Sequence, residues 1–312
     1  MAEGPFLVIS YRYHIVSVIG IFLALAVGVV IGTSALNGAV VGDLHRQVSD
    51  LKASNNAANA ANTQLQARAG DGNSLAKTYG SKVVAGSLQG VTVVILGAPG
   101  ATADLKNAVA NEVALAGGKV TGRFQLSSAF SDPQRAADIK ALATTGAHPV
   151  GLQLPASDDA GVLAGSLLGY VLFGHGQATD LTQVLTGFET LNMAKAEGGV
   201  ASSGKLLMIV APGSQPSADG AGKMMMSTAV QLATSGGATM VVGDATSAAA
   251  NGLIGLVRAD AHAKETVTTV DNGSTPLGQV GAILAGQQLL TGHKGQFGSA
   301  AGADSLLPQT GQ

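Results

Sequence analysis

The sequence IVSVIGIFLALAVGVVIGTSA, residues 15–35, decides how this chain is organised, because it contains no charged residue. At a rise of about 1.5 Å per residue, a helix of about 20 residues crosses the hydrocarbon core of a bilayer. The run is apolar on every face, unlike a surface helix of a soluble domain. It therefore predicts a single transmembrane helix over residues 15–36. Cleavage as a signal peptide is the alternative interpretation, since the run ends in the small residues Thr33, Ser34 and Ala35.

The residues just before this run indicate its orientation. Tyr11, Arg12 and Tyr13 precede it directly. Aromatic side chains favour the headgroup layer, and arginine favours the cytoplasmic side. We therefore expect these three residues to anchor the helix at the cytoplasmic face, with residues 1–14 in the cytoplasm. The bulk of the chain then lies outside the cytoplasm, in the cell envelope, whether the apolar run is retained or cleaved.

Small residues recur every four positions within the apolar run, at Gly20, Ala24, Gly28 and Gly32. This spacing places all four on one side of a helix, and small residues allow two helix backbones to approach closely in lipid. We interpret this face as the contact of a homodimer. The alternative is that glycine is simply common in this chain, which has 44.

Residues 37–72 predict a helical stalk next to the membrane. The stretch 43–69 lacks Pro and Gly and is rich in good helix formers. The stretch also contains a heptad seam of the kind that pairs helices in a coiled coil, formed by Leu44, Val48, Leu51, Ala58 and Leu65. Asparagines interrupt this seam, so a stable coiled coil by itself is a weaker expectation than a helix. The turn-forming sequence Asp71-Gly72-Asn73 is expected to end the stalk.

Residues 85–292 predict an extracytoplasmic α/β domain with a mostly parallel sheet, because short β-branched runs alternate with helix-length segments. Strands are expected at 91–96, 119–126, 206–211, 239–242, 253–257 and 266–270. Helices are expected at 102–116, from 131–133 onward, at 157–173, 180–194 and 223–235, and from Thr275-Pro276 to Leu290. The tail, residues 293–312, is rich in small residues and is expected to be irregular.

Composition excludes several kinds of partner and site. The formal net charge is −2, which gives no reason to expect nucleic acid as a partner. The chain has no cysteine, which removes disulfides, thiolate metal ligands and cysteine nucleophiles together. Only 12% of the residues are charged, and hydrophobic residues make up 46%, enough for a substantial core.

The sequence contains no recognisable catalytic motif. The turn 97–101 after the first strand contains two glycines but is neither GxGxxG nor a P-loop. Asp244 and Asp271 follow predicted strands, where carboxylates more often cap turns than catalyse reactions. The six histidines show no zinc-ligand spacing. The consecutive methionines 224–226 point about 100° apart on a helix, which favours a packing role over a copper site.

Several blocks of the sequence resemble one known family. These are residues 9–17 (ISYRYHIVS) and 22–32 (FLALAVGVVIG), then 90–95, 257–260, 267–271 and the helix near 283–290 with Gly292-His293 after it. In this order they resemble the mycobacterial copper transport protein B family of actinobacteria. The resemblance implies a role in copper efflux or homeostasis in the cell envelope, and makes copper the metal to consider, although the sequence locates no site for it. Members have been described as pore-forming in the outer membrane, whereas a membrane barrel would need many alternating strands.

Two functional interpretations follow. The first is a non-enzymatic, membrane-anchored envelope protein of copper efflux or homeostasis. The alternative is a dimeric scaffold that recruits or regulates a cell-wall (peptidoglycan) hydrolase during cell separation, with an envelope protein as its partner. An enzyme acting on envelope material is a third and weaker hypothesis, because the sequence offers no site for it.

Overall fold

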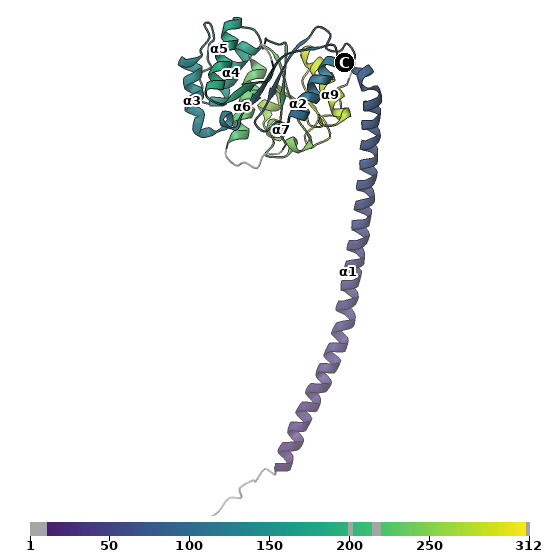
Figure 1. Ribbon diagram of the computed structural model, residues 1–312. Helices are drawn as coiled ribbons and strands as arrows, with labels where there is room; N and C mark the ends of the chain where they lie inside the picture. The colour runs from purple at the N-terminus through teal and green to yellow at the C-terminus, as the bar shows by residue number, and fades with distance from the viewer. Residues whose placement is uncertain (1–10, 199–201, 214–219, 310–312) are drawn as a thin grey trace, which may run out of the picture. The chain divides into compact units, whose positions relative to one another are not determined.

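The computed structural model describes residues 11–198, 202–213 and 220–309, apart from the side chains of residues 34–41. Residues 1–10 of the predicted cytoplasmic segment and residues 310–312 of the tail lie outside this part. The chain forms two compact units, Met1–Ala69 and Gly70–Gln312. Each unit is described by itself below (Figure 1).

The first helix, α1, spans Tyr11–Val84 and includes the predicted membrane segment. One stretch of it, Tyr11–Thr33, is long and apolar enough to cross a membrane, with a mean hydropathy of 2.8, and no part of its most apolar window is buried inside the protein. The structure therefore has the N-terminal transmembrane helix that the sequence predicts, as judged by its length and composition.

The second unit contains a seven-stranded sheet in the order β3-β2-β1-β4-β5-β6-β7. Every neighbouring pair is parallel except β2 and β3, which are antiparallel. The strands are β1 Thr92–Gly97, β2 Lys119–Leu126, β3 Ala194–Ala196, β4 Leu206–Val210, β5 Ala238–Val242, β6 Thr268–Val270 and β7 Gln296–Phe297. The predicted mostly parallel α/β domain is confirmed.

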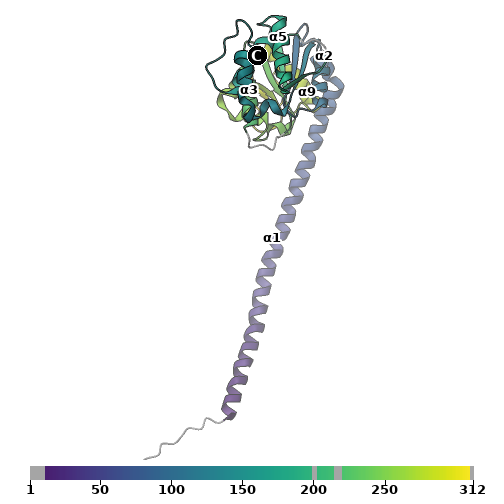
Figure 2. The same cartoon turned by 60° about the vertical axis from the view of Figure 1, so that its left-hand side comes forward.

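Helices surround this sheet (Figures 1 and 2). The helices after α1 are α2 Ala103–Leu115, α3 Ala136–Ala141, α4 Ala160–Leu172, α5 Ala178–Thr190, α6 Ala221–Thr234, α7 Leu253–Ala259, α8 Ala261–Thr266 and α9 Pro276–Leu290. Short 3-10 turns are η1 Ser128–Ser131, η2 Pro133–Arg135 and η4 Ala245–Ala248, and η3 Leu142–Gly146 is a π-helical turn.

The central strands are buried on both faces, which explains their continuous apolar sequence. Alternate residues of β4 enter different cores: Leu207 and Ile209 pack with α4 to α7, whereas Leu206 and Met208 pack with α2 and α9. Thr239 of β5 is also buried, and its hydroxyl has no hydrogen-bond partner. An unpaired buried hydroxyl costs free energy, so this residue is a local weakness of the core.

Helices α4 and α6 approach closely because glycines recur every four residues along α4, at Gly161, Gly165 and Gly169. A Cβ added to Gly165 would lie 2.7 Å from the Cβ of Gln231 and 2.8 Å from the carbonyl oxygen of Thr228. Such distances are shorter than side-chain packing allows, so only glycine permits this contact. Small residues spaced four positions apart therefore form a helix–helix contact within the second unit.

The prediction that α1 ends at residues 71–73 is wrong, because the helix continues to Val84. In the second unit its last turns pack against α9. A Cβ added to Gly80 would lie 2.6 Å from Val280 Cγ2, and Asn73 Oδ1 accepts a hydrogen bond from Leu277 N at 3.3 Å. Val84 is fully buried in the same core. This tertiary packing outweighs the local turn preference of Asp-Gly-Asn.

Two other predictions are corrected. Residues 253–257 form α7 rather than a strand; Leu253, Ile254 and Val257 are buried at helical spacing, which a run this short does not reveal. The tail is not wholly irregular, since Gln296 and Phe297 form β7 at the edge of the sheet. The last helix begins at Pro276 and ends at Leu290 as predicted.

Candidate functional site

The predicted dimer face of the membrane helix is uncovered in the single chain. A Cβ added to Gly20, Gly28 or Gly32 would meet nothing within 4 Å. Ala24, the fourth residue of the face, and the anchor residues Tyr11, Arg12 and Tyr13 are exposed as well. The single chain thus leaves these surfaces free for lipid or for another helix.

The predicted stalk seam is exposed in the same way. The exposed fractions are 58% for Leu44, 59% for Val48, 77% for Leu51 and 62% for Leu65. Ala58 is exposed too. Large apolar side chains that stay exposed to water contribute no hydrophobic stabilisation. This row of residues would therefore be stabilised by burial against a second helix.

The carboxylates at the ends of β5 and β6 have different roles. Asp244 accepts hydrogen bonds from Thr246 N at 2.8 Å and Ser247 N at 3.1 Å, and so caps η4. This is the capping role that the sequence favours for Asp244. Its Oδ1 atom is thus engaged with backbone N–H groups at the start of η4.

Asp271 forms a buried ion pair that the sequence does not reveal by spacing. Its Oδ2 lies 2.7 Å from Arg258 Nη1, and the side chains are 0% and 4% exposed. Asp271 also accepts hydrogen bonds from Ser299 N at 2.8 Å and Ala300 N at 3.1 Å. Arg258 in turn donates to Phe297 O at 2.9 Å and to Thr269 Oγ1 at 3.1 Å. The pair therefore ties the C-terminal loop to the sheet.

Side chains pack against the first residue of the glycine turn after β1 on the α2 face. A Cβ on Gly97 would overlap Gln125 Oε1 and lie 3.0 Å from Lys106 Cδ. The buried Lys106 Nζ donates to Gln125 Oε1 at 2.6 Å and pairs with Glu197 Oε1 at 2.5 Å. Gly97 is thus required for packing.

The described part of the chain contains no group of three His, Cys, Asp or Glu residues that could hold a metal ion. His148 Nδ1 lies 2.9 Å from Ala143 O, His175 Nε2 lies 3.0 Å from Ser235 O, and His293 Nδ1 lies 3.1 Å from Thr291 Oγ1. Met224 and Met225 are buried in the core, as their predicted packing role requires. Copper binding stays a prediction.

Comparison with known proteins gives the chain its family. Residues 8–308 match the family described as "Copper transport outer membrane protein, MctB". The chain belongs to the MctB family. The resemblance seen in the sequence is thereby confirmed, and it connects this membrane protein with copper.

Relatives named copper transporter MctB are similar to this chain over all or nearly all of their length. The copper transporter MctB of Mycobacterium leprae is 31% identical over 316 residues, covering 96% of this chain and all of the relative. The copper transporters MctB of Mycobacterium bovis and Mycobacterium tuberculosis are each 28% identical over 309 residues, covering 96% of this chain and 98% of the relative. Arg258 and Asp271 lie in two of the sequence blocks that resemble this MctB family, which is the signal that could have identified them.

Proposed function

We propose that this protein is a non-enzymatic, membrane-anchored envelope protein that acts in copper efflux or homeostasis. The observation that carries this proposal is the match to the MctB family over residues 8–308. The strand-end carboxylates support the non-enzymatic part, because Asp244 and Asp271 are occupied in capping and in an ion pair. The N-terminus is cytoplasmic and the α/β domain extracytoplasmic in this proposal.

The protein acts as a homodimer in this proposal. A lone helix forms no channel, so any path for copper requires further helices from copies of this chain or from a partner. The uncovered glycine face and the exposed stalk seam support pairing. The soluble domain supports it as well, because glycines at the same spacing in α4 mediate its contact with α6.

The dimer is tested by charge substitution on the stalk seam. Leu51→Asp and Leu65→Asp should each dissociate the dimer of the full chain in mild detergent, because a charge within an apolar seam must be desolvated. Ala67→Asp is the matched control, since Ala67 lies two residues from Leu65 and off the seam. Sedimentation or chemical cross-linking measures the outcome. Equal dimerisation of the seam variants and the control would remove the seam from the proposal.

The role in copper is tested in two ways. A deletion strain should be more sensitive to copper than its parent and should be restored by the full chain. Isothermal titration of the purified protein with Cu(I) and Cu(II) addresses binding directly. Copper tolerance that does not change on deletion, together with no binding tighter than about 10 µM, would contradict the copper role.

The second candidate function is a dimeric scaffold that recruits or regulates a peptidoglycan hydrolase during cell separation. It is favoured by large apolar side chains that remain exposed at the end of α1: Leu75 is 62%, Tyr79 53% and Val83 56% exposed. Exposed apolar residues at a spacing of four form a stripe suited to a protein partner. Pull-down from native membranes with the full chain tests for the partner. A deletion strain that separates normally yet is copper-sensitive would reject this alternative.

A further inference from the structure

The carboxyl ends of β1 and β4 lie at the point where the strand order of the sheet reverses. From β1 the chain moves outward to β2, and it later returns to place β4 on the other side of β1. The helix after β1, α2, packs on one face, and the helix after β4, α6, packs on the other. Loops that leave in opposite directions open a crevice between them, and in parallel sheets ligands bind there.

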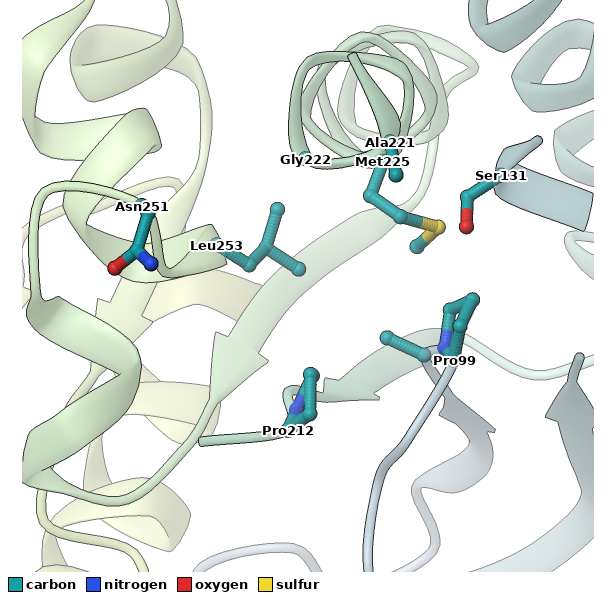
Figure 3. A pocket seen from close by; sticks show the side chains of 9 residues that line it. Pro99, Ser131, Pro212, Ala221, Gly222, Met225, Asn251 and Leu253 are labelled. Carbon is teal, nitrogen blue, oxygen red and sulfur yellow. The ribbon is translucent and has the colours of Figure 1, made fainter. Parts of the chain in front are cut away.

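A small hollow, partly open to solvent, occupies this crevice. Both loops have the sequence Ala-Pro-Gly, at 98–100 and 211–213, and Pro99 and Pro212 line the hollow. Met225 of α6 and Leu253 of α7 complete its apolar wall. Figure 3 shows these side chains around one open space, brought together from segments far apart in the sequence.

Polar groups reach the hollow from three directions, one of which is the amide side chain of Asn251 in its wall. Ser131 is 5% exposed, and its hydroxyl is directed toward the open space near Met225 (Figure 3). That hydroxyl donates to Ser128 O at 3.4 Å, longer than an ordinary O–H···O bond, so it can turn to a better acceptor. The third source is α6, whose first turn begins at Ala221 in the wall and whose cap residue, Gly220, provides no side-chain cap. The first N–H groups of a helix have no partner within it.

The walls decide what kind of ligand fits. Loops that cradle phosphate use backbone N–H groups, and Pro99 and Pro212 have none. The described residues that line the hollow include no charged side chain. An ion entering it would lose hydration, and only one helix end would compensate. A neutral oxygen can accept from Ser131 and from α6 without that cost.

We propose that this hollow binds a small neutral molecule with an aliphatic body and one hydrogen-bond-accepting oxygen. The aliphatic part packs between the two prolines, Met225 and Leu253, and the oxygen accepts from the Ser131 hydroxyl and from the first turn of α6. This site is separate from the dimer seam and from the role in copper, and its existence depends on neither.

Methyl NMR of the full chain in lipid nanodiscs, with methionine labelled at its methyl carbon, tests the site. The three probes share a five-membered ring: cyclopentanone is neutral, cyclopentanecarboxylate is an anion and cyclopentylammonium is a cation. Cyclopentanone should shift the Met225 signal saturably, with a Kd in the millimolar range expected for a molecule of so few atoms. Met208 and Met240, both fully buried in the opposite core, should not shift and report that the domain is folded.

Substitutions locate the binding. Ala221→Leu fills the mouth and should abolish the Met225 shift, whereas Ala103→Leu should preserve it, because Ala103 is likewise the first residue of its helix. Ser131→Ala should weaken cyclopentanone binding about fivefold. The proposal is overturned if the Met225 shift does not saturate, if either charged probe binds as well as cyclopentanone, or if Ala221→Leu and Ala103→Leu behave alike.

Discussion

Replacement of Asp271 by asparagine tests whether the buried ion pair holds the C-terminal loop to the sheet. The substitution keeps the size of the side chain and removes its charge. Arg258, whose side chain is 4% exposed, would then remain as a buried cation without its carboxylate. Asn also carries an NH2 group where the backbone N–H groups of Ser299 and Ala300 now donate to a carboxylate.

The expected loss is large relative to the stability of a domain. Breaking a buried pair by removing one partner costs about 3–5 kcal/mol, because an uncompensated charge stays inside. A typical domain is stable by only about 5–15 kcal/mol. Removing both charges, in Arg258→Met with Asp271→Asn, should cost less than the sum of the single substitutions, since no lone charge remains.

Urea unfolding of the full chain in mild detergent, followed by circular dichroism, gives the free energy of unfolding. Hydrogen exchange at residues 296–301 reports release of the loop. Asp244→Asn is the control, because it makes the same chemical change at the neighbouring strand end and asparagine also caps helices well. A loss below about 1 kcal/mol for Asp271→Asn, or additive effects in the double variant, would refute the ion-pair reasoning.

Three further outcomes are expected in the same unfolding assay. Thr239→Val should leave the free energy of unfolding unchanged or raise it, because it removes an unpaired buried hydroxyl. Thr269→Val should lower it by about 1–3 kcal/mol, because the Thr269 hydroxyl is hydrogen-bonded. A loss of stability in Thr239→Val would contradict this reasoning. Gly80→Ala should cost about 1–3 kcal/mol through overpacking, and Gly70→Ala, which meets nothing, should stabilise α1; similar effects at both sites would reject the docking of α1. Burial raises the pKa of Glu112 in the folded protein. As the pH rises through that pKa, the carboxylate becomes ionised and the free energy of unfolding falls. Glu112→Gln should therefore be more stable than the parent at pH 7, with the difference vanishing as acid protonates Glu112, and a gain that persists in acid would exclude this cause.

Much of the fold could be predicted because local patterns carry it. The run 15–35 is too long and too apolar for a soluble helix, and strands buried on both faces have continuous apolar sequences. The last helix was predicted at both ends, since Thr275 and Pro276 are strong start signals. Residues 253–257 were wrongly predicted as a strand because five apolar residues do not distinguish the two periodicities.

The candidate sites could be predicted only where they depend on one helix. The glycine face and the stalk seam follow from spacing along α1, and both stay predictions of pairing until a second helix is observed. The hollow between Pro99 and Pro212 joins residues far apart in the chain, and the ion pair joins Arg258 to Asp271 across a helix and the next strand. Residue spacing in the sequence contains no information on such tertiary contacts.

The sequence by itself determined the membrane helix, the mostly parallel α/β class and the family resemblance, because hydrophobic runs and short motifs are local properties of the chain. Tertiary structure alone decided that α1 continues past Asp71 to Val84, since packing of Gly80 against Val280 outweighs a local turn signal. It also gave Asp244 and Asp271 different roles, although both follow a strand. Only folding brings Arg258 to one of them and leaves the other to cap a turn.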